Sequence, residues 1–170
     1  MGDNFFVYLQ QMEMMAFFSG YPLVYFFIQA FIKPTVKNNI IASIPSLLSF
    51  GYALAGTAYL GFKIKNLYPN YAIQYMQDSV QLPFLFTWAL LSLLFWKPSI
   101  SKIKWLSMLH SLVFFYFLLQ DLTVQIVHPS QPKEMLNNDM KIYALSILLN
   151  IITIIIVTLI NYLFQRIKKH

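Results

Sequence analysis

Cysteine is absent from this chain of 170 residues, and charged residues are scarce. Without cysteine, a disulfide framework and a thiolate metal site are both excluded. Only 11% of the residues are charged, against about 25% in soluble globular domains. A soluble domain with 58% hydrophobic residues would leave large apolar patches in contact with water. The composition therefore indicates an integral membrane protein.

Apolar segments recur along the chain, separated by short connections. A helix needs about 20 residues to cross the hydrocarbon layer, which is about 30 Å thick. Five segments come close to this length or exceed it, near residues 14–32, 40–62, 80–96, 105–127 and 142–164. They are continuously apolar rather than alternating, which favours helices over a closed barrel. The sequence predicts an all-α fold, a single polytopic membrane helical bundle over residues 1–170 with about five transmembrane helices.

The first apolar segment is the weakest, because Pro22 lies near its middle. Proline removes a backbone donor and kinks or breaks a helix. One alternative is a kinked crossing helix. In the other, residues 5–18 lie along the membrane interface with Gln10, Gln11 and Glu13 toward water, as a short re-entrant or bent element.

The basic residues are divided unequally between the two ends of such a bundle. Eight follow the first, third and fifth segments: Lys33, Lys37, Lys97, Lys102, Lys104, Arg166, Lys168 and Lys169. Four lie on the other side, together with acidic residues: Lys63, Lys65, Lys133 and Lys141. Because cytoplasmic loops carry the excess of lysine and arginine, we expect an external amino terminus and a cytoplasmic carboxyl terminus.

Titratable side chains occur on one face of the fourth segment. His110 and Asp121 are eleven residues apart, a net rotation of about 20° on a helix, and Gln125 and His128 follow on the same side. Exposing Asp121 to lipid would cost about 2.5–3.5 kcal/mol, so we expect this stripe to face the bundle or a hydrated cavity. The stripe has three interpretations: polar groups near the headgroups, a network that fixes helix rotation, or a proton, ion or ligand path.

The fifth segment carries a similar polar face. Asn150, Thr153 and Asn161 share one side of a helix that otherwise consists of Ile, Leu and Val. If the fourth and fifth segments pair in antiparallel fashion, Asp121 and Asn150 lie at similar depths. We therefore expect a hydrogen bond between them, and we count Asn150 and Asn161 among the candidate site residues.

The second segment is rich in small residues. Ser49, Ala53 and Gly56 share one face of a helix, and Gly51 begins a second small-xxx-small pair. Between helices in lipid, small residues supply packing by allowing close backbone approach. This face is expected either to form the centre of the bundle or to dock another subunit.

Several chemistries find no support in the residues. Three histidines and no cysteine, at these spacings, do not indicate a zinc site, and haem ligation lacks two histidines on facing helices. No phosphate-binding loop, dinucleotide fingerprint or nucleophile–base pair is present. The net charge of +6 comes from lysine and arginine residues that lie between or after the apolar segments, where they indicate membrane topology. It does not predict nucleic-acid binding. We expect no cofactor, no metal and no catalytic residues.

These observations favour a small polytopic membrane protein that acts as a non-catalytic subunit or accessory factor in a larger membrane complex. Its expected partners are the lipid bilayer and other membrane subunits. The alternative is a membrane binder or carrier of a small hydrophobic or protonatable ligand, using the stripe on the fourth helix. Richness in Ile, Asn, Lys, Phe and Tyr favours a bacterial inner membrane, with an organellar membrane as the alternative.

Overall fold

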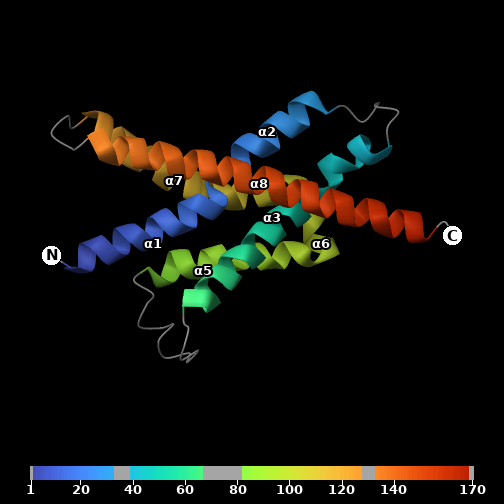
Figure 1. Cartoon of the computed structure of the whole chain (residues 1–170), viewed down its shortest axis with the longest axis horizontal. Coiled ribbons are helices and arrows are strands. Elements are labelled where there is room, and N and C mark those ends of the chain that lie inside the picture. Colours follow the sequence, from blue (N-terminus) through green and yellow to red (C-terminus); the bar gives the residue numbers. More distant parts are fainter. Residues whose placement is uncertain (1, 33–38, 67–81, 128–132, 169–170) are drawn as a thin grey trace.

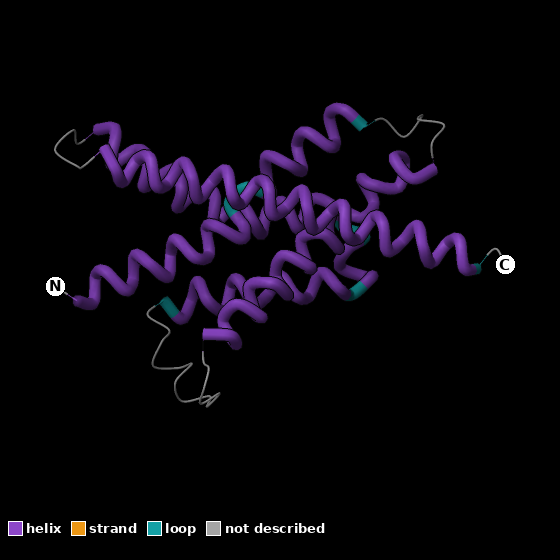
Figure 2. The backbone as a smooth tube through the Cα atoms, viewed as in Figure 1, coloured by secondary structure: helices purple, strands orange, loops and turns teal. Residues whose placement is uncertain are grey.

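The computed structural model describes residues 2–32, 39–66, 82–127 and 133–168, and these are almost entirely helical (Figures 1 and 2). No strand occurs among them, so the all-helical class is confirmed. The helices are α1 Gly2–Phe18, α2 Tyr21–Phe31, α3 Asn39–Asn66, α5 Pro83–Leu91, the 3-10 helix η1 Ser92–Trp96, α6 Pro98–Ser101, α7 Lys104–Val127 and α8 Lys133–Ile167.

The chain runs back and forth along an elongated bundle. Figure 1 shows α1 and α2 leading away from the amino terminus, α3 returning, α5 to α6 running forward, α7 returning and α8 running forward again. The two termini lie at opposite ends of the bundle (Figure 1).

Among the described residues, four helical segments are long and apolar enough to cross a membrane. They are Val7–Phe31, Ile40–Asn66, Lys104–Val124 and Asn138–Ile167. The segment expected near 80–96 forms the shorter apolar helix Pro83–Trp96. With a rise of about 1.5 Å per residue in α5 and about 2.0 Å in η1, this segment is about 23 Å long, less than the hydrocarbon thickness. Length and composition therefore support four crossings directly, and the fifth only as a short segment.

The short segment ends where the sequence dictates. Lys97 precedes Pro98, and a residue before proline is driven out of the helical region. Lys97 accordingly has an extended conformation, with φ −73° and ψ 120°. The helix therefore ends at Trp96, and a new turn, α6, begins at the proline.

The first segment is helical from Gly2 but is interrupted at Ser19 and Gly20. Pro22 occupies the first turn of α2, where its missing N–H is tolerated. Both halves contribute side chains to the core next to this break: Met15 and Phe18 of α1 and Tyr21 of α2 are buried. The break at Ser19 and Gly20 agrees with the kinked alternative.

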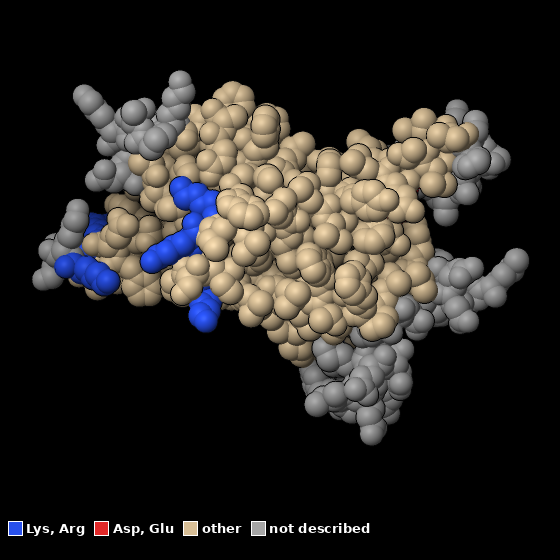
Figure 3. Space-filling view, turned by 180° about the vertical axis from the view of Figure 1, so that it is seen from behind, with Lys and Arg blue, Asp and Glu red and all other residues tan. Residues whose placement is uncertain are grey.

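The surface of the bundle is largely apolar. On α8 the exposed side chains include Ile152, Ile155, Ile156, Leu159 and Leu163. Figure 3 shows one face of the molecule, on which lysine and arginine gather at the end that carries the carboxyl terminus. An apolar belt with a charged end is the pattern of a helical bundle whose solvent is lipid.

Candidate functional site

The predicted stripe on α7 faces the interior. Ser107, His110, Phe114 and Leu118 are all buried, and Asp121, further along the same face, is partly exposed. The side chain of Gln125 and all of His128 lie outside the described residues. From Ser107 to Leu118, this face of α7 is therefore buried.

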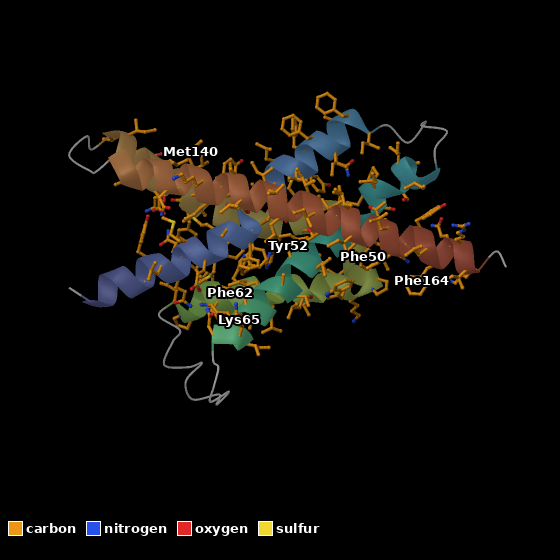
Figure 4. All side chains as sticks on the ribbon, in the orientation of Figure 1. Phe50, Tyr52, Phe62, Lys65, Met140 and Phe164 are labelled. Atoms are coloured by element: carbon orange, nitrogen blue, oxygen red, sulfur yellow. The ribbon has the colours of Figure 1, made fainter. Side chains whose placement is uncertain are left out.

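Both nitrogens of the His110 ring have hydrogen-bond partners. Nε2 lies 2.9 Å from the carbonyl oxygen of Trp88, which can only accept, so Nε2 carries a proton and donates it. Nδ1 lies 2.8 Å from the hydroxyl of Tyr52, which donates to it when the imidazole is neutral. Tyr52 points into the middle of the bundle from α3 (Figure 4). In this tautomer His110 has neither a free donor nor a free acceptor.

Aromatic rings enclose the His110 imidazole. The Trp88 ring is stacked on it, with centroids 4.8 Å apart and planes 5° apart. Tyr52 and Phe95 approach edge-on at 5.6 Å and 5.7 Å. The Trp88 indole N–H also donates to the His110 carbonyl oxygen, at 3.1 Å. His110 therefore joins α3, α5, η1 and α7 at one point, which we call the histidine box.

Asp121 belongs to a different group of polar contacts, centred on α1. Gln11 donates from Nε2 to its Oδ2 at 3.1 Å. On the same helix Tyr8 donates to Asp139 of α8 at 3.1 Å, and Asp139 is fully buried.

Further polar side chains of α1 reach α3 and the start of α5. Glu13 forms an ion pair with Lys63 of α3. Gln10 accepts a hydrogen bond from the backbone N–H of Leu82 at 3.0 Å, and it is only 4% exposed. Gln10 is therefore buried and not turned toward water, whereas Gln11 and Glu13 are partly exposed. All three side chains connect α1 to other helices.

The two polar groups on α7 are separated by an apolar layer. His110 and Asp121 are eleven residues apart, about 16 Å along the helix. Between them Phe114 and Leu118 are each 1% exposed, and Phe18 of α1 stacks on Phe114 with centroids 4.8 Å apart. A proton or ion passing along this face would have to cross that layer, so the side chains of the stripe do not form a continuous relay.

Asn150 contacts the break in the first segment rather than Asp121. Its amide nitrogen donates to the carbonyl oxygens of Phe17, at 3.0 Å, and Ser146, at 2.8 Å. The hydroxyl of Ser146 accepts from the N–H of Gly20 at 2.8 Å. The expected hydrogen bond between Asp121 and Asn150 is therefore not formed, because each side chain is engaged with α1.

These contacts satisfy two backbone groups at the break, the Phe17 carbonyl oxygen and the Gly20 N–H. In lipid an unpaired N–H or C=O costs several kcal/mol, so a broken helix needs neighbours that replace the lost bonds. Ser146 and Asn150, one turn apart on α8, supply a hydroxyl and an amide at this point. Asn161 lies three turns further along α8 and is partly exposed.

The small residues of α3 lie against other helices of the same chain. A Cβ atom on Gly51 would lie 2.6 Å from the Ile154 side chain of α8, and one on Gly56 would lie 2.0 Å from the Ser92 hydroxyl of η1. Ser49 and Ala53 are also buried, and the Ser49 hydroxyl lies 3.3 Å from that of Ser107. This face is covered by the chain itself.

Replacing Gly56 by alanine tests the contact between α3 and η1. We expect Gly56→Ala to lower the free energy of unfolding by about 1–3 kcal/mol, the usual cost of overpacking. Ser92→Ala removes the hydroxyl that the new methyl group would meet, so the double variant should regain part of the loss. Denaturant titration in mild detergent measures all three variants. If the losses in free energy of unfolding of the two single variants add up to that of the double variant, the side chains at positions 56 and 92 are not in steric contact.

Periodicity identified the face that carries His110 and Asp121, but not the residues that bind them. Tyr52, Trp88 and Gln11 lie on other helices, 58, 22 and 110 residues away from their partners. One feature of the sequence could have identified α1 as the helix that binds Asp121: Gln10, Gln11 and Glu13 lie on an otherwise apolar helix. Polar side chains within a membrane helix usually face a partner.

Among the described residues, no group of three or more His, Cys, Asp or Glu side chains could hold a metal ion. No protein-family model, no curated protein and no solved structure matches the chain. The argument for a function therefore rests on the geometry of these helices.

Proposed function

We propose that this chain is a non-catalytic subunit or accessory factor of a larger membrane complex. It crosses the membrane five times, with the short helix Pro83–Trp96 as the third crossing. Its amino terminus is external and its carboxyl terminus cytoplasmic, in a bacterial inner membrane.

One observation carries this proposal. Most of the polar side chains described inside the bundle bind other residues of the chain: His110 binds Tyr52 and Trp88, and Asp121 binds Gln11. Groups used in this way fix the positions of helices and do not point toward a substrate. Two buried oxygen atoms, the Tyr59 hydroxyl and Asn150 Oδ1, have no hydrogen-bond partner among the described residues. What the bundle offers to other molecules is its apolar exterior, which suits lipid and neighbouring membrane helices alike.

The course of the chain supports the five crossings and the orientation. The termini lie at opposite ends of the bundle, as an odd number of passes requires (Figure 1). The residues that follow the first, third and fifth passes carry eight of the twelve lysine and arginine residues. Such an excess marks the cytoplasmic side.

Purification from native membranes tests the proposal. We expect the tagged full chain, extracted in a mild detergent, to migrate in a complex much heavier than its own 19.9 kDa and to retain a partner membrane protein in fixed stoichiometry. An unrelated tagged membrane protein of similar size, carried through the same steps, controls for adventitious partners. Recovery of the chain as a lone monodisperse bundle would contradict the proposal. A lone bundle that retains a small hydrophobic or protonatable molecule would favour the carrier function instead.

A further inference from the structure

The connection between η1 and α7 has an unusual sequence, Trp-Lys-Pro-Ser-Ile-Ser-Lys-Ile-Lys-Trp. Three lysines, Lys97, Lys102 and Lys104, lie between Trp96 and Trp105. We call residues 96–105 the basic turn. It lies at the end of the bundle that carries the carboxyl terminus (Figure 1).

The inner side of the basic turn is fixed to the bundle. Ser101 is 4% exposed, its hydroxyl donates to the Pro98 carbonyl oxygen at 3.2 Å, and Ile100 packs against the main aromatic core. Backbone bonds from Ser101 to Lys97 and from Ile103 to Ile100, at 3.1 Å and 3.0 Å, close the turn. The Trp96 indole N–H also donates to the Thr57 hydroxyl of α3, at 2.9 Å. The segment therefore holds a defined shape, from which the three lysines and Trp105 extend outward.

The outer side of the basic turn combines positive charge with exposed indole rings. All three lysines are exposed, and Trp96 and Trp105 are 44% and 56% exposed. Tryptophan prefers the interface between hydrocarbon and headgroups, where its ring is apolar and its N–H is polar. Lysines beside such rings reach the depth of the lipid phosphates.

The positive charge of the basic turn has no partner within the described residues. The ion pair that occurs among the described residues joins Lys63 to Glu13, away from the basic turn. The acidic side chains that the structure describes, Glu13, Asp121 and Asp139, contact other helices. Figure 3 shows lysine and arginine, but no acidic side chain, on the face that it presents at this end. Arg166 and Lys168, at the end of α8, are exposed as well.

We propose that the basic turn binds the phosphate headgroups of anionic phospholipids. The lysines pair with the phosphates, and the two tryptophan rings hold the turn at headgroup depth. A basic side chain near an anionic lipid surface contributes about 1 kcal/mol, equivalent to about fivefold in lipid occupancy. This inference requires that the chain lies in a membrane, but not that it belongs to a larger complex.

The test uses the full chain in nanodiscs of equimolar phosphatidylcholine and phosphatidylglycerol, followed by transfer to mild detergent. Native mass spectrometry then measures the ratio of phosphatidylglycerol to phosphatidylcholine that remains bound. We expect the unchanged chain to be enriched in phosphatidylglycerol. The double variant Lys102→Gln/Lys104→Gln should lower this ratio by about fivefold for each lysine removed. High salt should lower it as well, because the interaction is screened.

A matched control is available at the opposite end of the bundle. Lys65 and Lys141 are exposed, and Lys65→Gln/Lys141→Gln removes the same charge. These two lysines have no tryptophan beside them in the sequence, so this control should lower the ratio much less than the variant of the basic turn. The proposal fails if the unchanged chain shows no enrichment, or if the control lowers the ratio as much as the variant of the basic turn. It also fails if an acidic protein, rather than lipid, is released by salt from this end.

Discussion

Gly20→Ala is expected to lower the free energy of unfolding by about 3 kcal/mol or more, the upper part of the range for overpacking. A Cβ atom at this position would lie 2.4 Å from the backbone nitrogen of Ile147 and 2.7 Å from the carbonyl carbon of Ser146. Backbone atoms within a helix cannot rotate away, so α1 and α2 would have to separate from α8. Separation would also break the bonds to Ser146 and Asn150, which satisfy the break in the first segment.

Gly61→Ala is the matched control, because a Cβ atom on Gly61 meets nothing within 4 Å. Alanine is favoured over glycine in a helix by about 0.5–1 kcal/mol, so this variant should be as stable as the unchanged chain or more stable. Ser146→Ala, which removes one hydrogen bond without a clash, should lose about 1 kcal/mol and remain folded. Denaturant titration in mild detergent ranks the three variants. Equal stability of the Gly20 and Gly61 variants would show that α1, α2 and α8 are not held in close contact at this point.

The sequence was sufficient to predict the apolar helices and the inward position of His110. Four of the five expected segments, near 14–32, 40–62, 105–127 and 142–164, overlap helical segments that are long and apolar enough to cross a membrane. The prediction that His110 turns toward the bundle agrees with its position on α7, because the cost of exposing a titratable group to lipid decides helix rotation.

Contacts between helices could not be predicted, because helical periodicity carries no information on which helix lies opposite. The expected bond from Asp121 to Asn150 assumed that α7 and α8 face each other at this depth. Instead α1 packs against both of them and supplies Gln11 to one side chain and the Phe17 carbonyl to the other. The break at Ser19 and Gly20 allows the Phe17 carbonyl oxygen to accept a hydrogen bond from Asn150.

The third segment shows a second limit of the sequence. Its apolar run continues to Trp96, and composition alone predicts a helix near 80–96 that could cross the membrane. Pro98 ends the helix, and the last five residues, Ser92–Trp96, tighten into a 3-10 helix. Gly56 lies directly against Ser92 in this part of the chain. The tight packing of η1 on α3 is a tertiary contact, and the local sequence pattern of the third segment does not predict it.

His110→Ala is expected to lower the free energy of unfolding by about 3–5 kcal/mol, the usual cost of deleting a large buried ring. The substitution leaves a cavity between Trp88, Tyr52 and Phe95, and it removes the partner of the Trp88 carbonyl oxygen and of the Tyr52 hydroxyl. Because the histidine box joins α3, α5, η1 and α7, its loss should loosen the short third segment first. Hydrogen exchange measured over residues 83–96 should therefore rise before exchange in α8 does.

Two milder variants separate packing from hydrogen bonding. Tyr52→Phe keeps the ring and removes one hydrogen bond, and should cost about 1 kcal/mol. His110→Phe keeps an aromatic ring beside Trp88 and removes both hydrogen bonds, so its stability should lie between those of the other two variants. If His110 only stabilises the packing of the helices, the folded His110→Phe protein will still enter the same membrane complex. The opposite result is that His110→Phe is as stable as Tyr52→Phe but no longer enters the complex, or no longer retains a bound small molecule. In that case the imidazole itself is used in function, and the histidine box is a functional site and not only a structural contact between helices.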